Sequence, residues 1–329
     1  MIAKFYRYLL HNQVILSLFI IAAGWLLFHI RGIIVSIFIS YIIMAALLPG
    51  VHYLRRKRFP KILAVLIPYV GVFMVIFLLI IPLIPFTLSQ ISSLLNGLPH
   101  YLDNSATVFG FHIDQAKINE YFSTGVTSLG KNAVDVTSRV FGGLLSTLTV
   151  LVVSFYLLNY NDSFRRKFAQ LFDQEERDNV HKTLQLVDDK LGAWLRGQFI
   201  LCFAIGLGTF IILTILKMPY ALPLALIAGF LEVLPTLGPI LSAVPAVIVA
   251  LTISPAMAVA VVIAYLLIQM LENNLLVPKI MQHAVGLNPV IIILSIMIGA
   301  NLMGIAGALL AIPFVSFVIV VAKSLKEQN

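Results

Sequence analysis

The stretch MPYALPLALIAGFLEVLPTLGPILSAVPAVIVALTI, residues 218–253, decides the fold class of this chain. Glu232 is its only charged residue and lies three residues before the sequence Pro235-Thr-Leu-Gly-Pro239. A carboxylate at membrane depth costs about 2.5 to 3.5 kcal/mol on insertion scales, so it is retained only where it faces protein or water. The prolines and the glycine interrupt the helix, and interrupted backbone is tolerated in a bilayer only where it lines a cavity or is buried in protein. These features together indicate a membrane transporter.

The composition supports a membrane protein. Of the 329 residues, 60% are hydrophobic and only 11% are charged, whereas a soluble domain carries about 25% charged residues. The excess apolar surface is therefore expected to face a lipid bilayer. The formal charge of +8 comes from basic residues at the ends of apolar runs, such as Arg55-Arg-Lys-Arg58. That is the positive-inside pattern, and it argues against a nucleic-acid partner.

We predict an all-α polytopic helical membrane protein with about eight membrane segments, because runs of about 17 to 25 apolar residues are long enough to cross a bilayer. The expected spans are 14–30, 33–48, 62–88, 141–160, 198–216 and 256–271, with longer interrupted runs at 218–253 and 287–322. The second span is expected to end at Pro49 and Gly50. Loop charges predict that both termini lie in the cytoplasm.

The chain is expected to divide into three parts. Residues 1–160 would form an N-terminal membrane scaffold with an external amphipathic segment at 89–140, residues 161–196 a cytoplasmic amphipathic helical segment, and residues 197–329 the C-terminal transport core. The middle part contains a short heptad seam, made of Val180, Leu184, Val187, Leu191 and Trp194. Two heptads are too short for a free coiled coil, so the seam would dock on the protein's own cytoplasmic face or on a neighbouring subunit of a homo-oligomer.

The two interrupted runs in the C-terminal half allow two arrangements. As one helix, each run of about 35 residues would reach roughly 50 Å, against a hydrocarbon core of about 30 Å. Each could be a long, tilted and kinked span, or a re-entrant hairpin of two half-helices. Lys279 and His283 would lie outside in the first case and inside in the second, which slightly favours hairpins. Paired interrupted segments are also typical of transporters with a site at the membrane midplane.

Three motifs follow one another in the C-terminal half. They read Glu232-Val-Leu-Pro235-Thr-Leu-Gly238-Pro239; then Glu272-Asn-Asn-Leu-Leu-Val-Pro278-Lys279 with Val285-Gly-Leu-Asn-Pro289; and Gly299-Ala-Asn-Leu-Met-Gly304-Ile-Ala-Gly307 leading to Pro313. In this order and spacing they resemble the autoinducer-2 exporter family of bacterial permeases, except that Ala300 stands where a second glycine is expected. The resemblance implies a secondary transporter of the cytoplasmic (inner) membrane, and export of an autoinducer-2-like signal is proposed for some members of the family. Other family members are sodium(lithium)/proton antiporters, so the solute or monovalent cation stays open.

Glu232 is the first candidate for the substrate or ion pathway. Desolvation favours the protonated form of a carboxyl group, so Glu232 could exchange a proton for a cation or for a substrate contact. Backbone carbonyls of the break at Pro235, Thr236, Gly238 and Pro239 would supply further ligands. The alternative is a structural carboxylate that accepts hydrogen bonds from backbone freed by the break.

Further polar candidates lie in the other two motifs. Glu272 is expected to end a span, where it could reach the headgroup region. Gln269 precedes it by three residues, so Gln269, Glu272 and Asn273 could instead form a polar stripe facing the pathway. Asn301 is either a neutral ligand or a helix cap. Gln198 is expected to anchor the start of its span at the membrane interface.

Small residues of the third motif are expected to act as a hinge or to allow close packing. Gly299, Gly304 and Gly307 interrupt the run, Pro313 follows, and Ala300, Ala308 and Ala311 extend a small-residue face.

No enzyme is expected, because Gly-x-Ser-x-Gly, His-Glu-x-x-His and Walker A motifs are absent. The histidines lack metal-ligand spacing and Cys202 is the single cysteine, so we expect no metal and no cofactor. A non-transporting oligomeric membrane scaffold, assembling partners through the heptad seam, is the alternative from another functional class.

Overall fold

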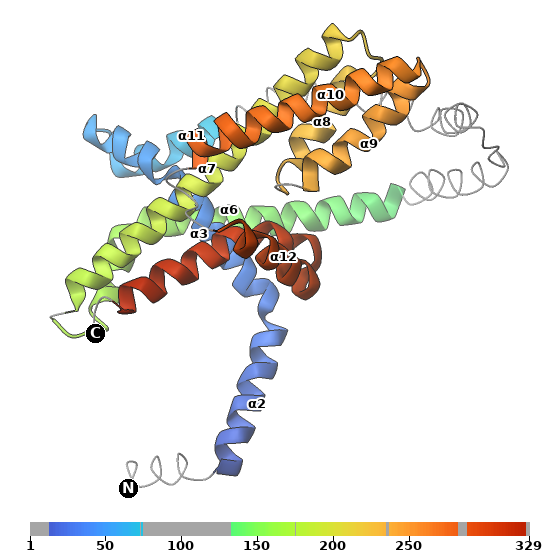
Figure 1. The fold of residues 1–329 in the computed structure, drawn as a ribbon. Coiled ribbons are helices and arrows are strands. Elements are labelled where there is room, and N and C mark those ends of the chain that lie inside the picture. The colour runs from blue at the N-terminus through green and yellow to red at the C-terminus, as the bar shows by residue number, and fades with distance from the viewer. Residues whose placement is uncertain are drawn as a thin grey trace, which may run out of the picture.

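The computed structural model describes residues 13–72, 74, 133–174, 176–234, 237–281 and 288–326. These residues form helices and no strand, which confirms the all-α class (Figure 1). The labelled elements are α2 (Gln13–His29), α3 (Arg31–Arg56), α6 (Ala133–Ala169), α7 (Arg177–Ile215), α8 (Ala221–Leu231), α9 (Leu237–Leu251), α10 (Pro255–Leu271), the π-helical turn η1 (Glu272–Leu276), α11 (Val277–Met281) and α12 (Pro289–Lys326). A further helix covers Lys61–Val72. Residues 89–132 of the expected external segment 89–140 lie outside the described residues.

Four helices of the described chain are long and apolar enough to cross a membrane: α3, α7, the continuous helix Pro255–Met281, and Val290–Ser324 within α12. The run 218–253 is not among them, because it forms two shorter helices. α8 has 11 residues and α9 has 15, which gives lengths of about 16 Å and 22 Å. Both are shorter than the hydrocarbon core of about 30 Å. The two helices pack against each other (Figure 1).

Helix α7 is the central helix of the described structure. It has 39 residues and packs against α3, α8, α10 and α12. Helix α7 therefore joins two parts that were expected to be separate. It contains residues 177–196 of the expected cytoplasmic segment and all but the last residue of the expected span 198–216. Val187, Leu191 and Trp194 of the heptad seam are buried in one core with Ile42 of α3 and Ile312 of α12. The seam thus docks on helices of its own chain.

Helix α3 does not end at Pro49 and Gly50, as the sequence predicted, but continues to Arg56. Proline has no N–H group, so Pro49 leaves the carbonyl oxygen of Ala45 without its helical donor. Arg196 of α7 takes that place: its Nη1 lies 3.4 Å from the Ala45 oxygen and 3.0 Å from the Ala46 oxygen. Gly192 permits the approach, because a Cβ atom there would overlap the Ala45 carbonyl. Arg196 therefore supplies the donor that allows α3 to continue past Pro49.

Helix α12 folds back on itself at its middle. Met303 and Gly304 leave helical geometry, and Gly304 has φ 62° and ψ −143°, a conformation that glycine alone adopts readily. A Cβ atom on Gly299 would overlap the carbonyl of Gly307, and one on Gly307 would overlap that of Gly299. In a straight helix these residues would be about 12 Å apart. The two halves of α12 are therefore in backbone contact across the turn.

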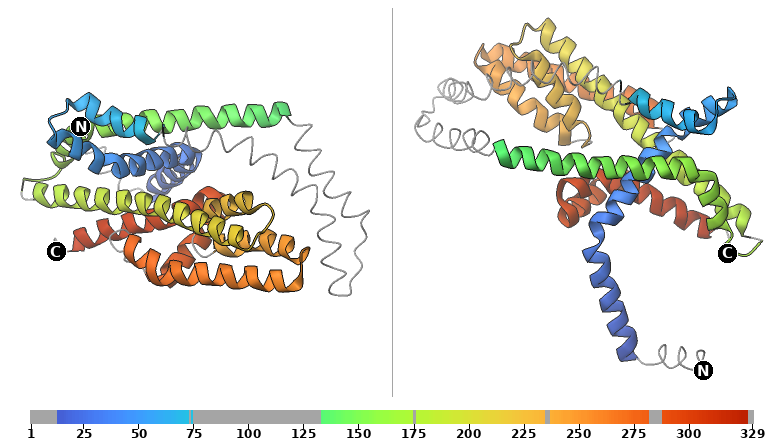
Figure 2. Two further views of the ribbon diagram at one scale, coloured as in Figure 1. Left: turned by 90° about the horizontal axis from the view of Figure 1, so that it is seen from above. Right: turned by 180° about the vertical axis from the view of Figure 1, so that it is seen from behind.

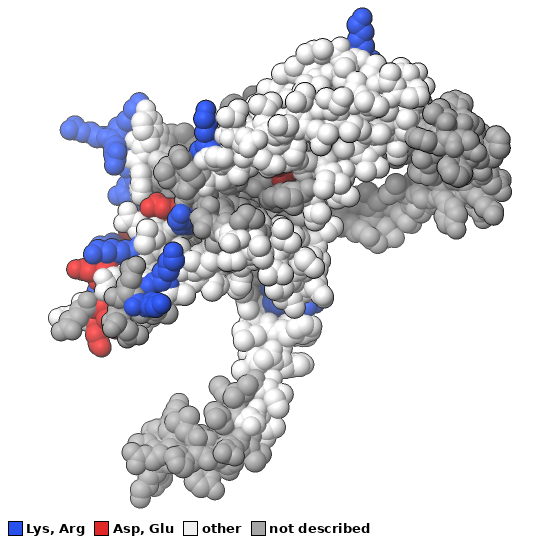
Figure 3. All heavy atoms as spheres, viewed as in Figure 1, with Lys and Arg blue, Asp and Glu red and all other residues white. Residues whose placement is uncertain are grey.

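Two further features complete the fold. α2 projects from the body of the molecule, with its described side chains largely exposed (Figure 2). Basic side chains gather at one end of the molecule (Figure 3), where α3 ends in Arg55 and Arg56, α6 in Arg166 and Lys167, and α12 in Lys323 and Lys326. This distribution agrees with the charge pattern read from the sequence.

Candidate functional site

Glu232 lies directly after α8 and is only 1% exposed. Its backbone N–H still bonds the Ala228 oxygen at 3.0 Å, and the chain then tightens, with the Leu234 N–H on the Leu231 oxygen at 2.9 Å. α9 begins at Leu237, and the Gly238 N–H returns to the Leu234 oxygen at 2.8 Å. A Cβ atom on Gly238 would overlap the Leu231 carbonyl. Glycine at this position is therefore what allows so tight a break beside the acid.

The other residues of this break have different environments. Pro239 is half-buried and its carbonyl oxygen accepts a hydrogen bond from Ser242 Oγ at 3.0 Å. Pro235 and Thr236 lie outside the described residues, so their role as carbonyl or hydroxyl ligands stays a prediction.

Glu272 does not end a helix. The chain continues from α10 through η1 and α11 to Met281, and the Val277 N–H bonds the Glu272 oxygen five residues back. Such π-helical turns are rare and often mark functional sites. Pro278 follows at once and cannot donate a backbone hydrogen bond. Glu272 follows the buried Ile268 by four residues and so continues the buried face of α10, where it is 3% exposed.

The carboxyl groups of Glu232 and Glu272 are both buried and lie close enough to interact directly. Two carboxylates have no proton to donate, so a direct hydrogen bond between them would need one shared proton. Neither acid belongs to the ion pairs found in the described residues, which join Arg55 to Asp162 and Arg165 to Asp188. Within the described part of the chain, no ion pair therefore offsets a charge on these two acids.

Amide groups surround the two acids. Gln269 Nε2 donates to Glu272 Oε2 at 3.1 Å and to Asn273 Oδ1 at 3.4 Å, so the polar stripe expected on this helix is present. Asn273 itself is exposed. Glu232 Oε2 is buried and has no hydrogen-bond partner among the described residues. That atom is the free acceptor of the site.

Gln198 also belongs to this site, although its position at the start of an apolar run predicts an anchor at the membrane interface. It is 4% exposed and donates from Nε2 to the backbone oxygen of Glu232 at 2.8 Å. The interface-anchor interpretation is therefore wrong. A signal was present in the sequence: Gln198, Leu201 and Ile205 follow helical spacing on one buried face of α7. Nearby, Gly206 and Gly229 bring α7 and α8 into backbone contact.

The third motif forms the turn of α12, and its Asn301 is not part of the acid pair's hydrogen-bond network in the described residues. Asn301 is exposed, and no hydrogen bond joins it to either carboxyl among the described interactions. Gly299, Gly304 and Gly307 form the turn of α12, and Pro313 is fully buried in its second half. As for metals, the described residues contain no group of three or more His, Cys, Asp or Glu side chains that could hold an ion.

Long apolar helices around a buried polar pair define a multi-pass helical membrane protein. The chain belongs to the AI-2E transporter family, which it matches over residues 14–327. It is 30% identical to YrrI of Bacillus subtilis over 296 residues, covering 85% of this chain and 82% of YrrI. It is 25% identical to the AI-2 transport protein TqsA of Escherichia coli, covering 85% and 83% of the two chains. The family resemblance of the three motifs is confirmed, and the protein has a role in membrane transport.

Proposed function

We propose that this protein is a secondary transporter of the cytoplasmic membrane that moves a small polar solute by alternating access. The transport core is residues 197–329, and the Glu232–Glu272 pair is its proton-holding group. An autoinducer-2-like signal is the first candidate solute, because TqsA, a relative over most of both chains, is an AI-2 transport protein. The energy would come from an ion gradient, and no catalytic step is involved.

The observation that carries this proposal is the close approach of two buried carboxyl groups from two interrupted segments. Burying a charge costs free energy that a structural role alone seldom offsets when no cationic partner is present. A pair that holds one proton can release it when a ligand supplies the missing interactions. The unpartnered Glu232 Oε2 is the atom positioned to receive such a ligand.

For the membrane arrangement we propose two re-entrant hairpins, with both termini in the cytoplasm. α8 and α9 would form the first hairpin and the two halves of α12 the second, while the helix Pro255–Met281 crosses between them. The short lengths of α8 and α9 and the return of α12 at Gly304 support this arrangement. Both acids would then lie where broken backbone lines a cavity, which is the environment such backbone needs in a bilayer.

A sodium(lithium)/proton antiporter is the second candidate function, and the acid pair also favours it. A monovalent cation between the two carboxylates would replace the shared proton without changing the net charge of the site. Gln269 Oε1 and the backbone oxygens of the break would complete the oxygen ligands that hard cations prefer. The two candidates share a site and differ in what displaces the proton.

Transport into proteoliposomes that contain the purified protein tests the proposal. A pH dye inside the vesicles reports proton movement when autoinducer-2, sodium or lithium is added outside. We expect one of them to drive proton release through the wild type, and Glu232→Gln to abolish it. Glu176→Gln, which changes an exposed acid before α7, should leave transport unchanged. Normal cellular function of the Glu232→Gln protein would support the scaffold alternative instead.

A further inference from the structure

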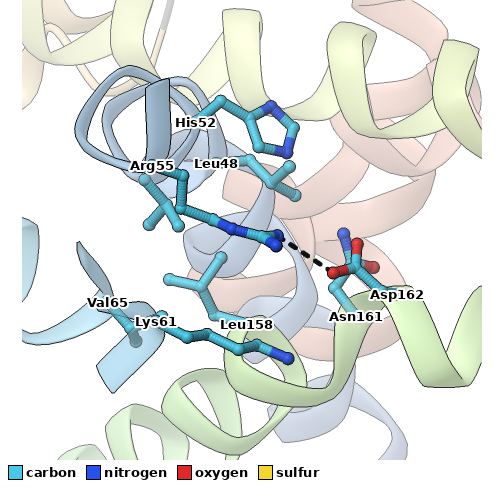
Figure 4. Close-up of a pocket in the computed structure, with 9 residues that line it drawn as sticks. Leu48, His52, Arg55, Lys61, Val65, Leu158, Asn161 and Asp162 are labelled. Atoms are coloured by element: carbon cyan, nitrogen blue, oxygen red, sulfur yellow. Dashed lines mark hydrogen bonds and ion pairs between the residues drawn. The ribbon is translucent and has the colours of Figure 1, made fainter. Parts of the chain in front are cut away.

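A second polar feature lies at the basic end of the molecule, away from the acid pair. It is a pocket between the end of α3, the start of the helix Lys61–Val72, and α6 (Figure 4). It is a shallow depression that is open to the outside: the enclosed space is about 10 Å³, and the larger figure of about 290 Å³ includes open solvent. Its lining residues are Leu48, Val51, His52, Arg55, Lys61, Val65, Leu158, Asn161 and Asp162.

The pocket has an apolar floor and a basic rim. Leu48, Val51, Val65 and Leu158 are all buried, with exposed fractions of at most 7%. His52, Arg55 and Lys61 are exposed, and Figure 4 shows the side chains of Arg55 and Lys61 reaching toward α6. The opening of the pocket is therefore lined by two cationic side chains and one histidine, with a single acid beside them.

That acid is Asp162, which accepts a hydrogen bond from Arg55 Nη1 at 3.0 Å. Both side chains of this ion pair are nearly half exposed, at 45% and 47%. An exposed pair of this kind contributes little to stability, about 0 to 1 kcal/mol. The guanidinium is therefore available to an anion that approaches from outside. Lys61 lines the same pocket and belongs to neither of the ion pairs found among the described residues.

An apolar track leads away from this rim. Ile62, Leu66 and Val70 of the helix that Lys61 begins are 64%, 39% and 56% exposed. These positions share one face of the helix and continue from Lys61 into the region of the predicted span 62–88. A ligand with a phosphate at one end and a hydrocarbon chain at the other matches both parts. A free phosphate would use only the rim.

We propose that the pocket between α3, the Lys61–Val72 helix and α6 binds the phosphodiester headgroup of an anionic phospholipid, held by Arg55, Lys61 and His52. Its acyl chain lies along the exposed face of the Lys61–Val72 helix. Basic pockets between membrane helices are suited to such headgroups, because the phosphate gains charge-assisted hydrogen bonds where the surrounding dielectric is low. The lipid would join three helices of the N-terminal part, and this site does not depend on what the protein transports.

The test is lipid binding to the full-length protein purified in neutral detergent. Short-chain phosphatidylglycerol is titrated in and the rise in unfolding temperature gives an apparent affinity; short-chain phosphatidylcholine and inorganic phosphate serve as comparison ligands. We expect phosphatidylglycerol alone to stabilise the protein. Arg55→Gln and Lys61→Gln should each weaken its binding about fivefold, since each removes one cation near the phosphate.

Two variants separate the pocket from general surface charge. Arg56→Gln removes the same charge from the next residue, which is exposed and does not line the pocket, so the affinity should stay within twofold of the wild type. Asp162→Asn should tighten binding severalfold, because Arg55 loses its competing carboxylate. Equal losses in Arg55→Gln and Arg56→Gln would overturn the proposal, as would an unchanged affinity in Asp162→Asn. Equal stabilisation by inorganic phosphate would show a free-anion site and no lipid site.

Discussion

The side-chain amide of Gln198 donates a hydrogen bond of 2.8 Å to the backbone carbonyl of Glu232. Gln198 lies in the middle of the long helix α7, and Glu232 follows the last residue of α8, where the helical pattern of hydrogen bonds is interrupted. A freed carbonyl at this depth has no water to accept from unless the site is open. The bond therefore fixes the break, and with it the position of the acid, on the most extended helix of the molecule.

Gln198→Leu should destabilise the protein and reduce transport. The substitution removes the donor that the described residues provide to the buried Glu232 carbonyl, which costs about 1 to 3 kcal/mol. Thermal unfolding in detergent measures the loss of stability, and the proteoliposome assay measures transport. Gln185→Leu is the matched control, because Gln185 is exposed on the same helix. A Gln198→Leu protein as stable and active as the wild type would contradict a positioning role.

Glu232 and Glu272 should behave as one functional unit. Each single change to glutamine keeps a hydrogen bond within the pair, because the amide can donate to the remaining carboxylate. The stability of each single variant should therefore stay within about 1 kcal/mol of the wild type, while transport is lost in both. The double variant should show no further loss of transport, since groups that act together are strongly non-additive.

Transport rates of the two single variants and the double variant test this coupling. Circular dichroism and thermal unfolding establish that each variant is folded. Full transport by Glu272→Gln, alongside no transport by Glu232→Gln, would show that Glu232 acts alone. It would remove the shared proton from the mechanism.

The return of α12 should depend on its glycines. Gly307→Ala places a Cβ atom against the Gly299 carbonyl, and overpacking of this kind costs about 1 to 3 kcal/mol. Gly304→Ala meets open space but a backbone conformation that alanine rarely adopts, with a cost of about 1 to 3 kcal/mol. Gly208→Ala, in α7 with no neighbour within 4 Å, should instead stabilise the helix by about 0.5 to 1 kcal/mol. Unfolding temperatures compare the three; equal effects would show that α12 is not folded back as described.

Much of the fold could be predicted because lipid imposes simple rules on sequence. The expected spans 14–30, 33–48, 141–160, 198–216 and 256–271 lie within or nearly within α2, α3, α6, α7 and α10. Helix ends were predicted less well. Pro49 looked like a terminator, but the donor that replaces its N–H comes from Arg196, far along the chain. Long-range hydrogen bonds of this kind leave no trace in local periodicity.

The candidate site shows the same division. Burial of Glu232 followed from its isolation in an apolar run, and the stripe of Gln269, Glu272 and Asn273 followed from helical spacing. The proximity of Glu232 and Glu272 could not be predicted, because it depends on how α10 packs against α7 and α9, and helical spacing does not encode that packing. Gln198 was misassigned for a related reason: its nearness to the basic segment suggested an interface, whereas its buried face is set by the packing of α7.

A buried acid near the basic end offers the last prediction. Asp188 of α7 is 4% exposed and accepts hydrogen bonds from Tyr41 of α3 and Arg165 of α6, so one carboxylate joins three helices. Asp188→Asn should lower the free energy of unfolding by up to about 3 kcal/mol, because the Arg165 charge loses its partner while remaining mostly buried. Asp189→Asn changes the neighbouring, exposed acid and should have an effect below about 0.5 kcal/mol. Thermal unfolding measures the stabilities of the two variants. Equal stabilities would mean that the three helices are held together by apolar packing alone.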